Sequence, residues 1–171
     1  HSRRTIVPPP ESLFSTLIES DQPVVADRTM TWSGVGRYGS HAESALTSPA
    51  LNWFFAEGAQ GFFQTYVLLA NPGATANSAE VRFLREGESP VVRTFPLDPT
   101  SRKTIFAGDI AEIVDRSFGI QVTFQNPGVA ERAMYFGFSP IFNAGHESAG
   151  VNAPAREWFL AEGATGSFFT T

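Results

Sequence analysis

The clearest pattern in this chain is a strict alternation of apolar and other residues. Between Phe118 and Phe124 every second side chain is apolar, and the positions between them carry Gly, Gln and Thr. Successive side chains of a β-strand point to opposite faces of the sheet, so a period of two is typical of a half-buried strand. We predict a strand whose apolar residues point inward and which ends at the turn signal Asn126-Pro127.

Similar strand-length patterns run through much of the chain. Further strands are predicted at residues 51–56, 62–70, 79–85, 91–97, 101–106 and 129–138. Residues 86–90 (EGESP) place Gly and Pro between two of these strands and indicate a hairpin. Only residues 109–116 have helical character. We interpret residues 140–154, which are rich in Gly, Pro, Ala and Asn, and their counterpart 32–49 as loops or linkers.

The sequence also repeats itself with a period of about 105 residues. Three pairs of segments match: residues 53–59 (WFFAEGA) with 158–164 (WFLAEGA), 22–30 with 126–134, and 2–6 with 101–105. We therefore divide the chain into the later part of one repeat (residues 1–52), a complete repeat (53–157) and the start of a third (158–171). About seven short antiparallel strands in a unit of this size are typical of an immunoglobulin-like β-sandwich.

The ordered motifs resemble a known type of repeat. They are WFFAEG, YVLLANPG, SRKTI, ERAMYF and a Gly-rich HES segment before the next W-F-x-A-E-G. Together they resemble an uncharacterised tandem W-[FY]-x-A-E-G repeat family of secreted bacterial proteins, and the match covers nearly the whole chain. The resemblance implies an extracellular or cell-surface, all-β module that occurs in tandem beside cell-wall modules and carries no catalytic residues.

Composition and charge narrow the function classes. Hydrophobic residues make up 42% of the chain and charged residues 17%, which is too apolar for disorder. The longest apolar runs, such as residues 66–70, have the length of a strand and are too short for a membrane span. A net charge of −5 argues against a general nucleic-acid binder. The absence of cysteine excludes disulfides, thiolate catalysis and cysteine metal sites.

Two motifs suggest chemistry only superficially. Residues 34–39 fit G-x-G-x-x-G, but a dinucleotide site needs a following helix, and the polar stretch here runs to Pro49. His41 and His146 recur, each with Glu-Ser close behind. One His and one carboxylate in each repeat are too few for a metal site, so we expect a hydrogen bond that holds the linker. We predict no cofactor, metal site or catalytic residue.

A repeated arginine suggests a structural ion pair. Arg132 shares its strand face with apolar residues, so its guanidinium should be partly buried and paired with a carboxylate. Glu57 is the expected partner because A-E-G accompanies the Arg motif in each copy, and Glu162 is the alternative. In that alternative, Arg28, the matching arginine of the first repeat, is expected to pair with Glu57.

Aromatic residues leave two functions open. Trp32, Tyr38, Phe138 and Phe142 lie at strand ends or in the segments interpreted as loops. Such side chains either fill the joint between neighbouring repeats or stack on sugar rings. We favour a non-catalytic structural or assembly module, such as a stalk, spacer or filament-forming repeat. The alternative is a carbohydrate- or cell-wall-binding module that uses these aromatics.

The incomplete first repeat suggests strand exchange. Residues 1–52 carry only the later strands of a repeat and should leave an open sheet edge. The expected inter-chain strands contain Ser2, Arg3, Arg4, Thr5 and Ile6 at one end and Phe168 and Phe169 at the other. The expected partners are neighbouring repeats or identical chains, in a polymer or longer array, with cell-wall polysaccharide for the alternative function.

Overall fold

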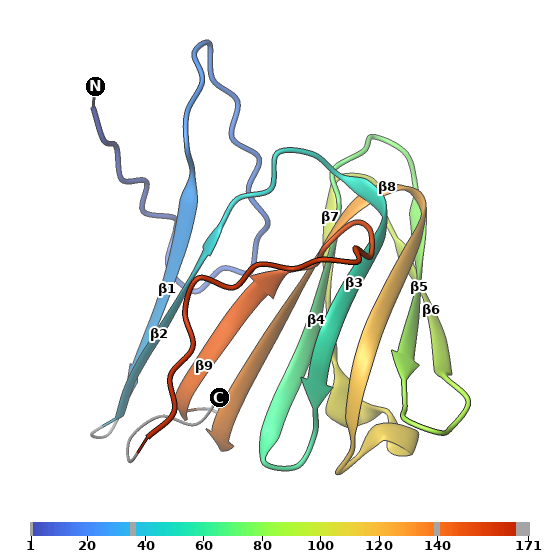
Figure 1. Ribbon diagram of the computed structural model, residues 1–171. Helices are drawn as coiled ribbons and strands as arrows, with labels where there is room; N and C mark the ends of the chain where they lie inside the picture. The colour runs from blue at the N-terminus through green and yellow to red at the C-terminus, as the bar shows by residue number, and fades with distance from the viewer. Residues whose placement is uncertain (1, 35–36, 139–140, 167–171) are drawn as a thin grey trace.

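The chain folds into antiparallel β-strands, and its computed structural model describes residues 2–34, 37–138 and 141–166 (Figure 1). The strands are β1 (Asp27–Gly34), β2 (Arg37–Ser44), β3 (Ala50–Ala59), β4 (Phe63–Asn71), β5 (Asn77–Leu84), β6 (Val91–Leu97), β7 (Ser101–Phe106), β8 (Ser117–Phe138) and β9 (Ile141–Ala149). Helical structure in the described part is limited to two 3₁₀ turns, η1 (Ala107–Asp109) and η2 (Ala111–Ile113). No helix there is long enough to cross a membrane. The all-β class expected from the periodicity is confirmed.

Strand β8 joins two sheets. Residues 117–128 of β8 pair with β3, and within that part residues 119–124 pair with β5 on the other side. Residues 129–136 pair with β4 on one side, and residues 131–138 pair with β9 on the other. Strand β6 extends the first group through β5, and β7 extends the second through β4. One continuous strand therefore sets the relative position of both groups.

Side chains satisfy the backbone where β8 passes from one group to the other. The Asn77 side chain donates to the Asn126 carbonyl (2.8 Å) and accepts from the Asn126 N–H (2.9 Å). The Trp53 indole N–H donates to the Gly128 carbonyl (2.9 Å). Pro127 has no N–H to leave unpaired. The expectation that the strand ends at Asn126-Pro127 is therefore wrong, because these side chains allow it to continue.

The apolar face of β8 forms the centre of the core. The alternate residues Phe118, Ile120, Val122 and Phe124 are all buried, as the period of two predicted. They pack in one cluster with apolar residues from β3 to β7 and from the 3₁₀ turns. The hairpin expected around residues 86–90 is confirmed as β5–β6.

Two segments interpreted as linkers contain strands instead. Residues 32–49 include β2, which pairs with β1 along its length, and residues 140–154 include β9, which pairs with β8. Their sequences are rich in short polar residues and show no apolar alternation. These strands are specified instead by pairing and by the packing of β2 against β9 (Figure 1). The helical character expected at 109–116 takes the form of the two single 3₁₀ turns η1 and η2, which begin two residues earlier and end at Ile113.

The ends of the chain lie outside the sheets. Residues 2–26, all of them described, form no helix or strand, and residues 2–25 are exposed. The expected strand at Ser2–Ile6 is thus not formed within a single chain, while Phe168 and Phe169 lie outside the described residues.

The packing of β8 makes a direct prediction. Replacing Ile120 by Ala should lower the free energy of unfolding by about 2–5 kcal/mol, since a fully buried side chain would leave a cavity. Gln121→Ala, one position along and on the other face, should change it by about 0.5 kcal/mol or less. Urea unfolding curves of the two variants measure the difference. Equal losses would contradict the assignment of faces.

Candidate functional site

The β1–β2 hairpin packs against β8 and β9 (Figure 1). Arg28, Met30 and Trp32 occupy every second position of β1, so they lie on one face of the hairpin. His41 pairs opposite Met30 and therefore lies on the same face. The Trp32 indole N–H donates to the Phe142 carbonyl (2.9 Å). This face of the hairpin therefore contacts β8 and β9.

A chain of polar contacts, which we call the joint cluster, connects Arg28 and His41 of the hairpin to Glu131, Tyr135 and Glu147 of β8 and β9. Arg28 places Nη1 3.1 Å from Glu131 Oε2 and Nη2 2.5 Å from Glu147 Oε1. The other Glu147 oxygen lies 3.1 Å from His41 Nδ1, and His41 Nε2 lies 2.9 Å from the Tyr135 hydroxyl. The His41 and Glu147 side chains are only 3% and 2% exposed, so the centre of this joint cluster is closed to water.

Burial shifts the proton affinity of three of these groups. It raises the pKa of Glu147 to about 7; Arg28 opposes this shift, while a hydrogen bond with the Glu131 carboxyl adds to it. Burial also lowers the pKa of His41, and the nearby Arg28 charge lowers it further. Burial raises the pKa of Tyr135 to about 12, so at neutral pH the phenol donates to Nε2 of a neutral His41. The Nδ1–H of His41 then faces Glu147.

This order of carboxylate, imidazole and hydroxyl is also found in hydrolase triads, but the surroundings here oppose catalysis. A raised pKa keeps Tyr135 protonated and weakly nucleophilic. His41 and Glu147 are closed to substrate. In the described residues, no group of three His, Cys, Asp or Glu side chains is placed to hold a metal ion. The joint cluster is suited to holding two segments together.

Two glycines let the aromatic rings lie close to the joint cluster. Trp32 pairs opposite Gly39, and a Cβ on that glycine would lie 2.3 Å from the indole. Tyr135 pairs opposite Gly145, where a Cβ would lie 2.4 Å from the ring. Each ring therefore covers a glycine on the neighbouring strand, and any larger residue would push it away from His41.

An apolar groove of about 310 Å³ borders the joint cluster. It is lined by Met30, Thr31, Trp32, Tyr66, Leu68, Thr104, Ala133, Tyr135 and Phe142. The Tyr135 ring stacks on Phe142 with centroids 4.7 Å apart and meets Trp32 and Tyr66 edge-on at 5.4 and 5.8 Å. The groove thus offers aromatic surface with few polar groups.

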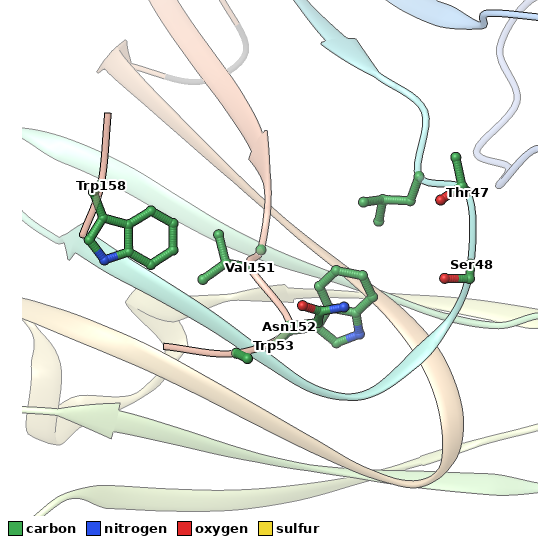
Figure 2. Close-up of a pocket in the computed structure, with 9 residues that line it drawn as sticks. Thr47, Ser48, Trp53, Val151, Asn152 and Trp158 are labelled. Atoms are coloured by element: carbon green, nitrogen blue, oxygen red, sulfur yellow. The ribbon is translucent and has the colours of Figure 1, made fainter. Parts of the chain in front are cut away.

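A second pocket, of about 320 Å³, is lined by residues from the segments that follow β2 and β9 and by two tryptophans. Figure 2 shows Thr47 and Ser48 from the segment after β2, Val151 and Asn152 from the segment after β9, and the two tryptophans Trp53 and Trp158. The segments after β2 and β9 occupy matching positions in the repeat. This pocket therefore lies between two segments at matching positions of the internal sequence repeat.

Arg132 is buried as expected, but its partners differ from those expected. It donates to the main-chain carbonyl of Glu57 and to Ser148 Oγ (3.2 Å), and it lies 3.4 Å from His146 Nδ1. The Glu57 side chain is exposed, because a bulge in β3 takes Ala56 and Glu57 out of the β3–β8 register. The direct carboxylate pairing expected for Arg132 is therefore wrong.

The expected partners of Arg28 and the alternative partner of Arg132 are also corrected. Arg28 binds Glu131 and Glu147 rather than Glu57, because its hairpin packs on the outer face of β8 and β9 instead of on β3. Glu162 is exposed in the segment that follows β9.

The structure separates the four candidate aromatics. Trp32 and Phe142 meet at the groove, whereas Tyr38 is 67% exposed near the tip of the hairpin. The side chain of Phe138 lies outside the described residues. Of residues 34–39, which fit G-x-G-x-x-G, Gly34 ends β1 and residues 37–39 begin β2, while residues 35 and 36 lie outside the described residues.

The sequence did not identify Glu131 and Tyr135 as members of the joint cluster, or Tyr66 as a residue that lines the groove. Glu131 and Tyr135 alternate with Arg132 on β8, so they lie on the opposite face of the strand. The available signal was that Glu131 and Tyr135 share a face of β8, because an aromatic residue on that face indicates that it is covered. Nothing in the sequence specified that the β1–β2 hairpin would cover it.

The comparisons with known proteins concern the fold. No protein-family model and no curated protein matches the chain. The crystal structure of Thermotoga maritima 1070 is similar with a TM-score of 0.54 and 17% sequence identity, over 60% of this chain and 94% of that one. The Anabaena sensory rhodopsin transducer gives a TM-score of 0.44 and 18% identity, over 52% of this chain and 86% of that one. The first likeness shows a shared fold alone.

The joint cluster predicts a pH-dependent stability. The folded pKa of Glu147, about 7, is above the ordinary value of 4.5, so this residue contributes stability below about pH 4.5 that is lost as the pH rises through about 7. His41 has a lowered pKa and contributes the opposite slope, because its stabilisation is lost as the pH falls below 6.5. In Glu147→Gln only the His41 slope remains. The variant should therefore lose stability on acidification more steeply than the unmodified chain.

Denaturant unfolding at a series of pH values from 4.5 to 7.5 measures this difference, in a range set by the Glu147 and His41 shifts. Glu86→Gln, in the exposed β5–β6 turn, serves as the control and should follow the unmodified chain. Parallel pH profiles for Glu147→Gln and the unmodified chain would contradict the assignment.

Proposed function

We propose that this chain is a segment of a tandem β-repeat array and acts as a non-catalytic structural module, a spacer or assembly unit. Each repeat of about 105 residues would form one immunoglobulin-like β-sandwich module, and its last two strands would dock on the next repeat. The observation that carries this proposal is the joint cluster, which connects Arg28 and His41 of the first repeat to Glu131, Tyr135 and Glu147 of the second.

The joint cluster is suited to fixing one orientation. Buried polar groups are costly unless they are paired, and only the docked position of the hairpin pairs Glu147 with both Arg28 and His41. A rotation of the hairpin would leave a carboxylate and an imidazole buried without partners. A joint built in this way transmits a defined direction from one module to the next, which is what a spacer or stalk requires.

The comparison with Thermotoga maritima 1070 supports a single repeat as a complete folding unit. The matched share, 60% of 171 residues, is about 103 residues, close to the repeat length, and it accounts for 94% of the other chain. The motifs of this chain resemble repeats of secreted bacterial proteins, and we place the array outside the cell or on its surface. Its partners are then neighbouring repeats or identical chains.

The proposal is tested by measuring the rigidity of the joint. The chain has no cysteine, so spin labels on Tyr38→Cys and Glu86→Cys report the distance between hairpin and module. We expect a narrow distance distribution that broadens with Arg28→Ala, which removes about 1–3 kcal/mol of charged hydrogen bonding. Arg82→Ala, which breaks an exposed pair with Glu80, should leave the distribution narrow. A broad distribution in the unmodified joint would refute a fixed spacer.

The apolar groove favours a second candidate function, a carbohydrate- or cell-wall-binding module. Trp32, Tyr66, Tyr135 and Phe142 present ring faces of the kind on which sugars stack. Sugar hydroxyls also need polar partners, and the groove has few. For this reason we rank binding below the structural role.

A pull-down on peptidoglycan and polysaccharide beads distinguishes the two functions. If the groove binds sugar, Tyr66→Ala should abolish retention. Phe62→Ala, which removes an aromatic ring 74% exposed outside the groove, should not. If the structural role is the only one, the unmodified chain should pass through all beads without retention.

A further inference from the structure

The apolar groove beside the joint cluster has aromatic walls whose polar atoms are already paired. The Trp32 indole N–H donates to the Phe142 carbonyl (2.9 Å), and the Tyr135 hydroxyl is hydrogen-bonded to His41 (2.9 Å). These two walls therefore offer ring faces, rather than hydrogen bonds, to a ligand. Because both rings are held at their polar ends, a flat apolar group can pack against them with little rearrangement.

A cation without a carboxylate partner stands at one end of the groove. Thr104 lines the groove, and Arg102, two positions earlier on β7, lies on the same face of the sheet and donates to the Thr104 hydroxyl oxygen. Glu131 lies across β4 from Thr104, but its carboxylate is bound by Arg28 (3.1 Å). Arg102 itself forms no ion pair in the described part of the chain. Its remaining N–H donors and the Thr104 hydroxyl proton are thus available to an anion.

The other end of the groove has the opposite charge. Tyr66 lines it and pairs with Phe106, the last residue of β7, and Asp109 follows in η1. Burial raises the pKa of Tyr66, and the nearby Asp109 charge raises it further. A ligand with one carboxylate would therefore turn that group away from Asp109 and toward Arg102. The groove thus distinguishes the two ends of such a ligand.

We propose that this groove binds a small aromatic carboxylic acid, with its ring among the groove aromatics and its carboxylate on Arg102 and Thr104. A volume of about 310 Å³ lies at the lower end of the range for small-molecule sites, which favours a ligand of one or two rings. One carboxylate matches the one cation available, whereas a sugar would need polar partners along its whole length. This inference is independent of the spacer role and gives the groove a ligand class other than sugar.

Two probes matched in ring system test the ligand class. Titration calorimetry of the unmodified chain compares 2-naphthoate with its uncharged analogue 2-naphthamide. We expect 2-naphthoate to bind more tightly by about tenfold or more, because a hydrogen bond to a charged group is stronger than a neutral one. Equal affinities for the two probes, or no heat of binding from 2-naphthoate at millimolar concentrations, would overturn the proposal.

Variants of single arginines test whether Arg102 is the group that holds the carboxylate. Arg102→Gln should weaken 2-naphthoate binding by about tenfold or more and change 2-naphthamide binding by about twofold or less. The matched control is Arg82→Gln, which removes an exposed guanidinium paired with Glu80 on β5 and should change neither affinity. The chain has a net charge of −5, so general attraction of an anion is disfavoured. Equal losses in the two variants would overturn the assignment to Arg102.

Two further variants place the ring and the carboxylate in the groove. Tyr66→Leu should weaken both probes by a similar factor, because both pack their rings there. Thr104→Val, at an exposed position where the change leaves the core untouched, should weaken 2-naphthoate alone. Loss of 2-naphthamide binding in Thr104→Val, or no effect of Tyr66→Leu on either probe, would overturn the placement.

Competition and the spin-label test separate this inference from the proposed functions. Excess N-acetylglucosamine should not displace 2-naphthoate, and displacement would overturn the ligand class in favour of sugar. The spin-label test of the joint is independent of these titrations. A broad hinge distance with selective 2-naphthoate binding would refute only the fixed spacer, and a narrow distance without that binding would refute only the ligand site.

Discussion

The structure depends on the uninterrupted pairing of β8, which forms hydrogen bonds on both sides in both of its parts. A strand of this length would ordinarily be interrupted at Asn126-Pro127. It continues because the Asn77 and Trp53 side chains satisfy the backbone at that point. The inward face of the first part forms the core, and the second part presents Glu131 and Tyr135 outward. The core and the joint cluster thus share one strand, β8.

The outward face of β8 is specific because it buries polar groups rather than only apolar ones. Apolar surfaces slide with little penalty, whereas the Glu147 side chain needs Arg28 and His41 in defined positions beside its two oxygens. The proton affinities of Glu147 and His41 are shifted toward the neutral forms by burial. Arg28 therefore keeps its charge at neutral pH, whereas burial disfavours the charged forms of Glu147 and His41.

The two arginines of the repeat show how one motif serves two environments. Arg132, inside the complete module, is satisfied by a main-chain carbonyl and by Ser148. Arg28, which matches Arg132 in the internal sequence repeat, binds the carboxylates of Glu131 and Glu147 instead. A guanidinium has five donors and can bind either set of partners.

The sequence by itself determined the β class, the inward face of β8, the β5–β6 hairpin and the burial of Arg132, because alternation and turn chemistry act between near neighbours. The sequence also showed which segments repeat. It did not show that Arg28 and His41 would contact Glu147. The sequence did not reveal β2 and β9, since their short polar residues carry no alternation and are held by pairing and by packing. The tertiary structure alone decided the partners of the two arginines: ion pairing acts over a few ångströms in space, and Arg28 and Glu131 are 103 residues apart in the chain.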